Sequence, residues 1–283
     1  MDTLFDPADN SGSSVARFTS DPDIAHVAME LRTHGNLVEI LGACIRTALD
    51  EIIDTARTGR WELEQCGDQE KAYLGVKIEN VVRGRFELAP ARRKAPDYEI
   101  AGIDVDCKWT KNMWQWSIPT EAEGIICLLL HADDAKSTFC AGLLRIQSDL
   151  LNPGANKDQK RTIRKDARGE IEWLCRPGSP LPNNFLLHMD STDRDAILAH
   201  RGGDARLCEL FRRHPGVLIK RHTIESLSQQ VDATRRARAT REVLGPEGFE
   251  VLNGHWKADK ARALELGGPA LHDSTDWVCL PSR

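Results

Sequence analysis

Apolar residues in the first third of the chain recur every three or four positions, which is the spacing of one face of a helix. Two successive helices are predicted between Asp23 and about Thr58, separated by a break near Gly35. A third helix is predicted from about Glu70 to Arg85. The opening part of the chain is therefore expected to be helical.

Beyond this helix the spacing changes to short apolar or β-branched runs, separated by turn residues such as Ala101-Gly102. Four strands are predicted, over Tyr98–Ala101, Ile103–Trp109, Gly124–His131 and Thr138–Ile146. Together with the preceding helices, they predict an α/β domain with a mixed sheet flanked by helices. The polar stretch 152–182, rich in Gly and Pro, is expected to be irregular apart from a short helix that ends near Cys175.

The C-terminal part is predicted to form three short helices and a strand, over Asp204–Arg213, Thr223–Gln230, Ala233–Leu244 and Phe249–Leu252. Thr223 and Asp232 are good N-caps, and Gly245-Pro246 ends the third helix. A helix pair with a tight join, followed by a strand for the wing, predicts a winged helix-turn-helix domain. The expected division is a disordered acidic arm at 1–20, the α/β domain at 21–189, a linker at 190–203 and the winged-helix domain at 204–283.

The composition is typical of soluble globular proteins, with 283 residues of which 41% are hydrophobic and 29% charged. The longest nearly apolar run, Gly124 to Leu130, is far below the roughly 20 residues of a membrane helix. The N-terminus lacks the basic start and apolar stretch of a secretory signal, so a cytosolic protein is expected. The eight cysteines are scattered without a C-x-x-C pair, which favours small buried hydrophobic residues over a zinc site or disulfides.

The net charge of -5 argues weakly against a nucleic-acid-binding protein, but charge is segregated along the chain. Residues 1–60 hold ten acids and five bases, whereas residues 200–263 hold thirteen bases and eight acids. The third C-terminal helix alone carries four arginines, Arg235, Arg236, Arg238 and Arg241. This helix is interpreted either as a basic recognition helix for DNA or as an ordinary surface helix.

The segment 96–109 has the pattern of a strand, a tight turn and a second strand. Because side chains alternate along a strand, Asp106 and Lys108 share one face, and the residues beside them point into a core. Asp97, at the head of the first strand, can approach the same polar face. Two carboxylates and an ammonium together are what metal-assisted phosphodiester hydrolysis requires. Mg2+ held by Asp97 and Asp106 would bind a phosphate oxygen, and Lys108 would orient or help deprotonate the attacking water.

Further candidates lie close to these three side chains. Glu79 borders the buried face of its helix and is interpreted either as a metal ligand or water-positioning group, or as an edge residue paired with Arg83. The backbone carbonyl of Cys107 is included among the metal ligands, and Asp104 is a spare candidate on the Asp106 face. Such residues also occur by chance in exposed hairpins, but two charges inside an apolar strand favour a functional partner.

The run Tyr98 to Lys108, with Asp97 just before it, resembles the active-site segment of the NaeI-type restriction endonucleases, including the Asp-Cys-Lys form of the PD-(D/E)xK motif. Thr58-Gly59-Arg60-Trp61, the helix at 75–80, the stretch from Leu150 to Arg161 and the C-terminal region are also similar, so the resemblance covers most of Asp23 to Arg283. It implies a magnesium-dependent nuclease that leaves a 5′-phosphate and a 3′-hydroxyl. The implied catalytic residues are Glu79, Asp97, Asp106 and Lys108, although the loop from Glu79 to Asp97 is slightly longer than the family pattern.

The same resemblance implies a second domain similar to the winged-helix part of catabolite activator protein. In that family the second domain binds another copy of the target duplex as an effector, and the protein is a homodimer. A cognate DNA methyltransferase is the implied genetic partner, and the bacterial cytoplasm is the implied location. A basic loop with Asn156, Lys157, Lys160 and Arg161 is interpreted either as a base-contacting DNA-binding loop or as a solvent-facing turn.

Two alternative functions stay open. A repair nuclease of the mismatch-nicking kind would use the same chemistry but would nick one strand near a lesion. A winged-helix regulator without catalysis would keep the N-terminal domain as a dimerisation unit. The intact set of Asp97, Asp106 and Lys108 argues against the regulator. The recognition sequence does not follow from the chain, because direct readout depends on where side chains meet base edges.

Overall fold

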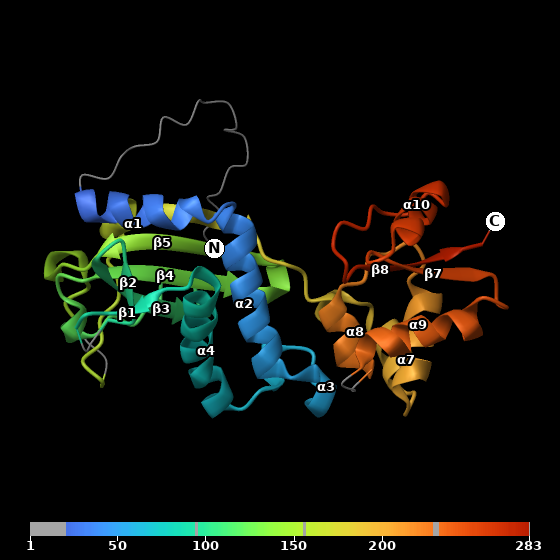
Figure 1. Cartoon of the computed structure of the whole chain (residues 1–283). Coiled ribbons are helices and arrows are strands. Elements are labelled where there is room, and N and C mark those ends of the chain that lie inside the picture. The colour runs from blue at the N-terminus through green and yellow to red at the C-terminus, as the bar shows by residue number, and fades with distance from the viewer. Residues whose placement is uncertain (1–20, 94–95, 155–156, 229–231, 283) are drawn as a thin grey trace.

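The computed structural model describes residues 21–93, 96–154, 157–228 and 232–282, and the arm at 1–20 lies outside them. Two groups of elements lie side by side (Figure 1). The first comprises α1 (Pro22–Thr33), α2 (Leu37–Ile53), α3 (Thr55–Thr58), α4 (Asp68–Phe86), β1 (Ala89–Pro90), β2 (Tyr98–Ile100), β3 (Ile103–Thr110), β4 (Ile126–Asp133), β5 (Thr138–Arg145) and β6 (Glu172–Pro180). The second comprises α5 (Phe185–His188), α6 (Ser191–Leu198), α7 (Gly203–Arg213), α8 (Arg221–Ser228), α9 (Ala233–Leu244), β7 (Phe249–Asn253), α10 (Lys257–Glu265) and β8 (Trp277–Pro281). Short 3-10 turns η1 (Leu63–Gln65), η2 (Thr120–Ala122), η3 (Asp134–Lys136), η4 (Ser148–Leu150) and η5 (Asp166–Glu170) lie in the connections.

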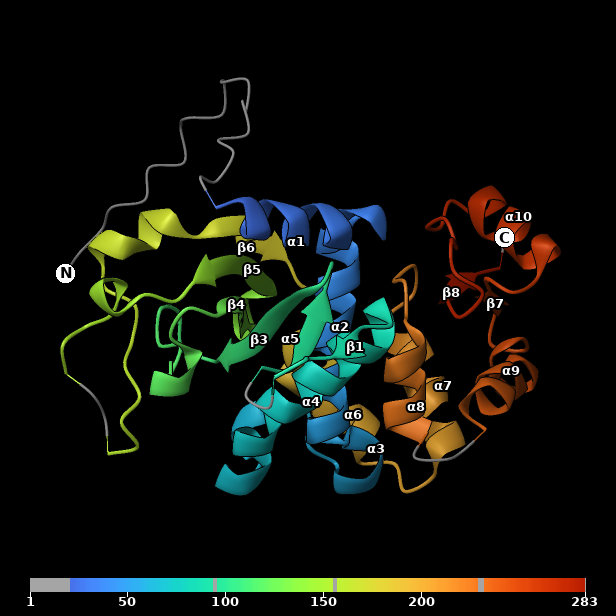
Figure 2. The same ribbon diagram turned by 60° about the vertical axis from the view of Figure 1, so that its left-hand side comes forward.

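The strands of the first group form one sheet in the order β1-β2-β3-β4-β5-β6. β3 and β4 run parallel, and the other neighbouring pairs run antiparallel. Helices α1, α2 and α4 cover one face of this sheet, as the view in Figure 2 shows. The mixed α/β fold predicted from the sequence is therefore confirmed.

The central strand β4 is buried on both faces, which explains its nearly continuous apolar sequence. Ile126, Leu128 and Leu130 pack against the helices, while Cys127 and Leu129 pack in a second cluster on the opposite face. That second cluster is covered by η2, η5 and the loops around them rather than by long helices. The opposite face of the sheet is thus where irregular segments approach the strands.

The second group is built around its own core, which includes Leu207, Phe211, Ala237 and Trp277. Ile197 of α6 is buried in this core, so the stretch 190–203, predicted to be a linker, contains a helix that packs there. Trp61, just before η1, also packs against this core from the first group. The exact domain limits stay a prediction.

The expected short helix ending near Cys175 is wrong. Cys175 lies in β6, where it pairs with Ala141 of β5, and the preceding 3-10 turn η5 ends at Glu170. The sequence did not predict this strand because it contains Pro177 and Pro180, and proline cannot donate a backbone hydrogen bond to a sheet. β6 tolerates them because it is the edge strand and because its pairing with β5 is irregular in this region.

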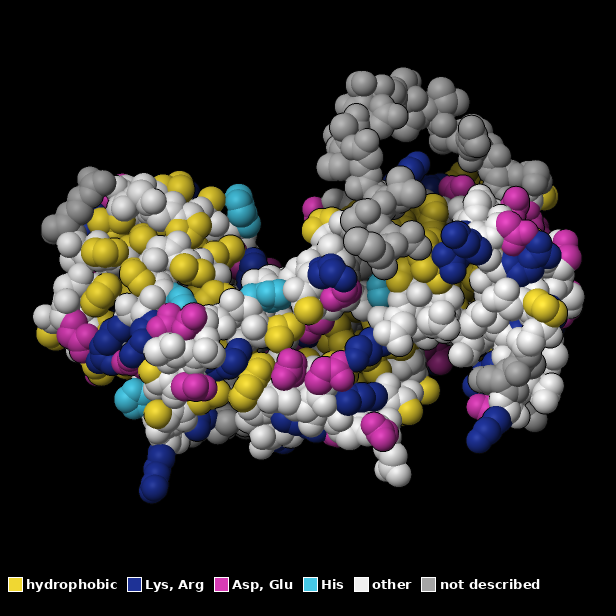
Figure 3. All heavy atoms as spheres, turned by 180° about the vertical axis from the view of Figure 1, so that it is seen from behind, with side chains coloured by type: hydrophobic (Ala, Val, Ile, Leu, Met, Phe, Trp, Pro, Cys, Tyr) yellow, Lys and Arg dark blue, Asp and Glu magenta, His cyan; other side chains and the backbone are white. Residues whose placement is uncertain are grey.

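Lys and Arg side chains lie among Asp and Glu side chains over the face seen in Figure 3. Ion pairs between such side chains include Arg212 with Glu247 at 2.7 Å and Arg213 with Asp193 at 2.7 Å. Within the described ranges, no helix combines the length and apolar character needed to cross a membrane.

Candidate active site

The candidate site begins with a tight hairpin between β2 and β3. The two turn residues, Ala101 and Gly102, both have positive φ, 51° and 78°, as a two-residue turn of type I′ requires. The turn sets the register in which Tyr98 lies opposite Val105. Just before β2, the backbone N–H of Asp97 donates to the carbonyl of Val105 at 3.1 Å. The hairpin therefore places Asp97 beside the middle of β3.

The Asp97 side chain, just before the first residue of β2, makes a further hydrogen bond to β3. Its Oδ2 accepts the backbone N–H of Cys107 at 2.7 Å. In a strand, the N–H and C=O of one residue point to the same side, so the Cys107 carbonyl also points toward Asp97 and away from β4. One carboxylate and one carbonyl thus converge at the head of the hairpin.

Asp106 and Lys108 lie on the face of β3 opposite the helices. Val105, Cys107 and Trp109 pack against the helix-covered core, whereas Asp106 is approached at 3.8 Å by the Sγ of Cys127 from the other face. Asp106 is 5% exposed, and the Lys108 Nζ lies 2.6 Å from its Oδ2. The alternation of side chains expected from the sequence therefore places both charges on one face of β3 that is largely shielded from solvent.

Burial controls the charge of this pair. It raises the pKa of Asp106 to about 6, although the Lys108 ammonium opposes the shift. Burial also acts to lower the pKa of Lys108, but the Asp106 carboxylate outweighs it and raises that pKa above its ordinary value. The nearby Asp97 adds to the upward shift of the Asp106 pKa. The carboxylates of Asp97 and Asp106 repel each other, and Lys108 supplies only one positive charge beside them. A bound cation would reduce this repulsion.

Glu79 reaches the same region from α4. Its carboxylate accepts a hydrogen bond from Arg83 Nη2 at 2.7 Å, and the same nitrogen donates to the backbone carbonyl of Asp97 at 3.1 Å. The Tyr98 hydroxyl donates to the backbone carbonyl of Glu79 at 2.9 Å. Burial raises the pKa of Glu79, and the charge of Asp97 adds to this rise. The pairing with Arg83, one of the two interpretations left open by the sequence, is therefore present, and it holds Glu79 close to Asp97.

The donor set fits a magnesium ion that keeps part of its water shell. Among the residues that the structure describes, no group of three or more His, Cys, Asp or Glu side chains is arranged to bind a metal. Mg2+ is commonly held by one or two carboxylates, with waters and substrate phosphates completing the shell. Asp97, Asp106 and the Cys107 carbonyl supply oxygens of this kind, whereas the Glu79 carboxylate is engaged by Arg83. The residues present therefore fit the metal without Glu79.

Comparisons with known proteins place this chain in a family. The family model described as restriction endonuclease NaeI matches residues 25–277. A protein of Lentzea aerocolonigenes, described as type II restriction enzyme NaeI, is 36% identical over an alignment of 234 residues that covers 80% of this chain and 73% of that protein. The chain belongs to the restriction endonuclease NaeI family. The predicted class of activity, that of a type II restriction endonuclease, is confirmed.

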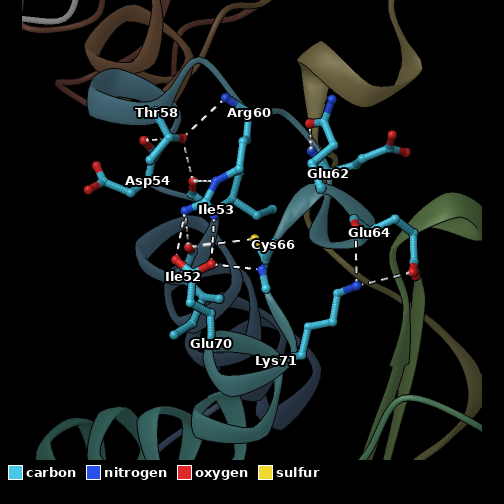
Figure 4. Close-up of polar contacts among 12 residues, drawn as sticks. Ile52, Ile53, Asp54, Thr58, Arg60, Glu62, Glu64, Cys66, Glu70 and Lys71 are labelled. Atoms are coloured by element: carbon cyan, nitrogen blue, oxygen red, sulfur yellow. Dashed lines mark hydrogen bonds and ion pairs between the residues drawn. The ribbon is translucent and has the colours of Figure 1, made fainter.

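In this NaeI-family chain, α4 is fixed at its start by Arg60, which lies in the Thr58–Trp61 segment (Figure 4). The Arg60 guanidinium donates to both oxygens of Glu70, at 2.7 and 2.9 Å, and to the backbone carbonyls of Ile52 and Ile53. Glu70 also accepts the N–H of Gly67 at 2.8 Å, and its pKa is lowered to about 2, chiefly by Arg60. Arg60 thereby ties the end of α2 to the first turn of the helix that carries Glu79.

The predicted DNA-binding residues differ in how far they are engaged within the protein. Arg236 pairs with Asp204 at 2.7 Å, and Arg241 pairs with Asp259 at 2.5 Å. Arg235 and Arg238 are exposed and have no ion-pair partner among the described residues. Two of the four helix arginines are therefore available to a ligand.

In the basic loop, Arg161 is engaged by the backbone of the loop itself. Arg161 donates to the backbone carbonyls of Ser148, Leu151 and Asn152 at 2.7 to 3.0 Å, so its guanidinium holds the loop together. Lys157 and Lys160 are exposed, and Asn156 lies outside the described residues.

Contacts made by three residues near the site, Asp104, Cys127 and Arg83, were not foreseen from the sequence. The spare candidate Asp104 is occupied, because it accepts the N–H of Arg92 at 2.8 Å and pairs with Arg93 at 3.1 Å. Cys127 approaches Asp106 because the two residues are partners in the parallel β3–β4 register, which no local motif reveals. Arg83 was considered as a partner of Glu79, but its bond to Asp97 depends on the tertiary approach of α4 to β2.

Proposed function

We propose that this enzyme hydrolyses duplex DNA with Mg2+ at a site formed by Asp97, Asp106 and Lys108. The observation that carries the proposal is the meeting of these three side chains on one hairpin. The Lys108 Nζ lies 2.6 Å from Asp106, and the Asp97 carboxylate is held on the backbone of Cys107. Buried charges of this kind are expensive in an otherwise apolar strand, so a catalytic role accounts for them better than a structural one.

In this proposal Asp97, Asp106 and the Cys107 carbonyl hold the metal. Bound Mg2+ supplies polarisation of a non-bridging phosphate oxygen and neutralises charge that develops on the phosphate. Lys108 donates a hydrogen bond to Asp106 and orients the attacking water from the side open to solvent. Water attacks phosphorus, the bond to the 3′ oxygen breaks, and that oxygen takes up a proton from solvent water, which gives a 5′-phosphate and a 3′-hydroxyl. Glu79, held beside Asp97 by Arg83, positions the water or receives its proton.

Replacing Lys108 by Ala is expected to lower the cleavage rate by about 10²- to 10⁴-fold, because positioned groups that move or orient protons contribute in this range. The measurement is single-turnover cleavage of a sequenced plasmid in the presence of Mg2+, with the ends mapped. EDTA should stop the reaction of the parent enzyme.

The matched control is Lys111→Ala. Lys111 follows the same strand, is half exposed and pairs with Glu64 away from Asp106. Its loss should leave the rate within about twofold of the parent. A Lys108→Ala enzyme that cuts as fast as this control would remove the lysine from the mechanism.

For the C-terminal group we propose a winged-helix domain that binds duplex DNA. It is supported by α7, α8 and α9 packed in one core with the β7–β8 pair, and by the two available arginines of α9. A helix, α10, stands between β7 and β8, where a simple wing would have a loop. Binding of a second, effector copy of the site, a homodimer, a cognate methyltransferase and a bacterial cytoplasmic location are proposed from family membership.

Arg235→Ala and Arg238→Ala are each expected to lower the slope of log affinity against log salt by about one. Each would remove one phosphate contact and the counterion release that accompanies it. The measurement is duplex binding by the full-length enzyme in Ca2+ buffer at several salt concentrations. Arg241→Ala is the control, because this arginine is held by Asp259 and should leave the slope unchanged. Equal slopes in all the variants would exclude the available face of α9 from DNA binding.

A further inference from the structure

We propose that a cavity in the C-terminal group binds one unpaired nucleotide of DNA, with its base out of the helical stack. The inference rests on the proposed DNA binding by this part of the chain. The cavity lies between the first turns of α9, the turn after β7 and the loop that precedes β8. It therefore opens beside the available arginines of the proposed recognition helix.

The chemistry of the cavity favours an anionic ligand with a planar ring. Its volume is about 430 Å³, and the lining includes Thr234, Arg238, His255, Trp256, Ser274 and Thr275. These side chains offer a guanidinium, an imidazole, an indole and three hydroxyls, and no carboxylate is among the lining residues. A phosphate is compatible with Arg238 and with the hydroxyl of Thr234, whereas the hydroxyls of Ser274 and Thr275 donate to the carboxylate of Asp273. An acidic peptide would leave the exposed Trp256 ring unused.

The aromatic side of the cavity, formed by His255 and Trp256, is exposed although its backbone is held by hydrogen bonds. Trp256 is 46% exposed, and its ring meets that of His255 edge to face at 4.8 Å. The backbone N–H of His255 donates to the Asn253 side chain at 3.1 Å, and that of Trp256 donates to the Asn253 carbonyl at 3.3 Å. Asn253 is itself buried and donates to the carbonyl of Asp276 at 2.9 Å. An exposed ring on such a fixed backbone is a ready stacking surface for a base.

A second side of the cavity, formed by the loop with Ser274 and Thr275, is fixed by Asp276, which is fully buried. Its carboxylate accepts the N–H groups of His272 and Asp273, both at 3.0 Å, and pairs with Lys220 at 2.6 Å. The two sides touch at Gly254, where a Cβ would lie 1.9 Å from the carbonyl oxygen of Asp273. Both sides are thus set before any ligand arrives, which reduces the entropy lost on binding.

An unpaired nucleotide fits this cavity better than an intact base pair. Paired bases expose only their edges to a protein, because their faces are covered by neighbours in the stack. The Trp256 ring can be used fully only by a base whose face is free, as in an extruded or unpaired nucleotide. The neighbouring Arg235 and Arg238 would then hold the flanking phosphates.

The test compares two duplexes that differ by a single unpaired nucleotide in the centre. Full-length protein carrying Asp106→Asn is used so that the DNA stays intact, and affinity is measured by fluorescence anisotropy. We expect about tenfold tighter binding of the duplex with the unpaired nucleotide, because stacking of one base on an aromatic side chain contributes this much or more. Trp256→Ala should abolish the preference, and Trp256→Phe should keep part of it because a ring remains.

Leu264→Ala is the matched control, since Leu264 is 59% exposed on α10 and does not line the cavity. It should keep the full preference. Equal binding of both duplexes by the parent would overturn the cavity proposal while leaving duplex binding intact. A preference that survives in Trp256→Ala, with circular dichroism confirming the fold, would also overturn it. Absence of binding to either duplex would instead contradict the proposed function.

Discussion

Cleavage by the Asp106→Asn variant is expected to fall by at least about a thousandfold, while duplex binding persists. The substitution keeps the size of the side chain but removes the charge that would hold the metal, and metal stabilisation of a phosphoryl transition state amounts to several kcal/mol. It also leaves Lys108 without its buried partner at 2.6 Å. The measurements are single-turnover cleavage, and calorimetric titration with Mg2+, in which the heat of binding should be lost.

The control for this experiment is Asp104→Asn. Asp104 lies on the same face of β3, but its carboxylate is occupied by Arg92 and Arg93. This variant should retain the Mg2+ titration and cleave within about threefold of the parent, since the Asp104 carboxylate contacts Arg92 and Arg93 rather than Asp97 or Lys108. A wild-type rate in Asp106→Asn would contradict the assignment of this hairpin as the active site.

Arg46→Ala is expected to lower the free energy of unfolding by about 3–5 kcal/mol, because it removes a buried cation that pairs with two partly buried carboxylates. The Arg46 side chain, on α2, is 5% exposed and pairs with Asp50 at 2.8 Å and with Asp134 at 2.6 Å. Burial raises the pKa of Asp50 above its ordinary value, with Arg46 opposing the rise. His222, on α8, is close enough for its charge to act on Asp50, so this cluster lies where the two groups of elements meet.

Urea unfolding followed by tryptophan fluorescence measures this effect. Arg32→Ala is the control, since the Arg32 side chain is 50% exposed and its pair with Glu172 should contribute no more than about 1 kcal/mol. Adding Asp50→Asn and Asp134→Asn to Arg46→Ala should recover part of the loss, because the unpaired charges are then removed. If Arg46→Ala were no less stable than Arg32→Ala, the buried pairs would make no net contribution.

The sequence predicted those parts of the fold that are determined by local pattern. The helices α2 and α4, the strands β2 to β5 and the hairpin with its polar face all follow from the period of apolar residues and from a turn that favours positive φ. The convergence of Asp97 with Asp106 was predictable for the same reason, because the hairpin joins them directly.

Other features depend on partners that are distant in sequence. β6 is recognisable only through its pairing with β5, and α10 buries little more than Ala263, so its apolar pattern is weak. The ion pairs of Arg236 and Arg241 with acids on other helices distinguish them from Arg235 and Arg238, a difference that composition cannot reveal. The cavity beside Trp256 likewise needs three segments to meet.

The two-residue turn at Ala101 and Gly102 also restricts how this family can diverge. One residue inserted between Asp97 and Asp106 would shift the register and turn Asp106 from the polar face into the helix-covered core. Insertions are tolerated far better in the connection between α4 and β2, where the Arg83 bridge rather than chain length brings Glu79 to Asp97. Homologues should therefore keep the number of residues between the equivalents of Asp97 and Lys108 unchanged. The number of residues between the equivalents of Glu79 and Asp97 should vary.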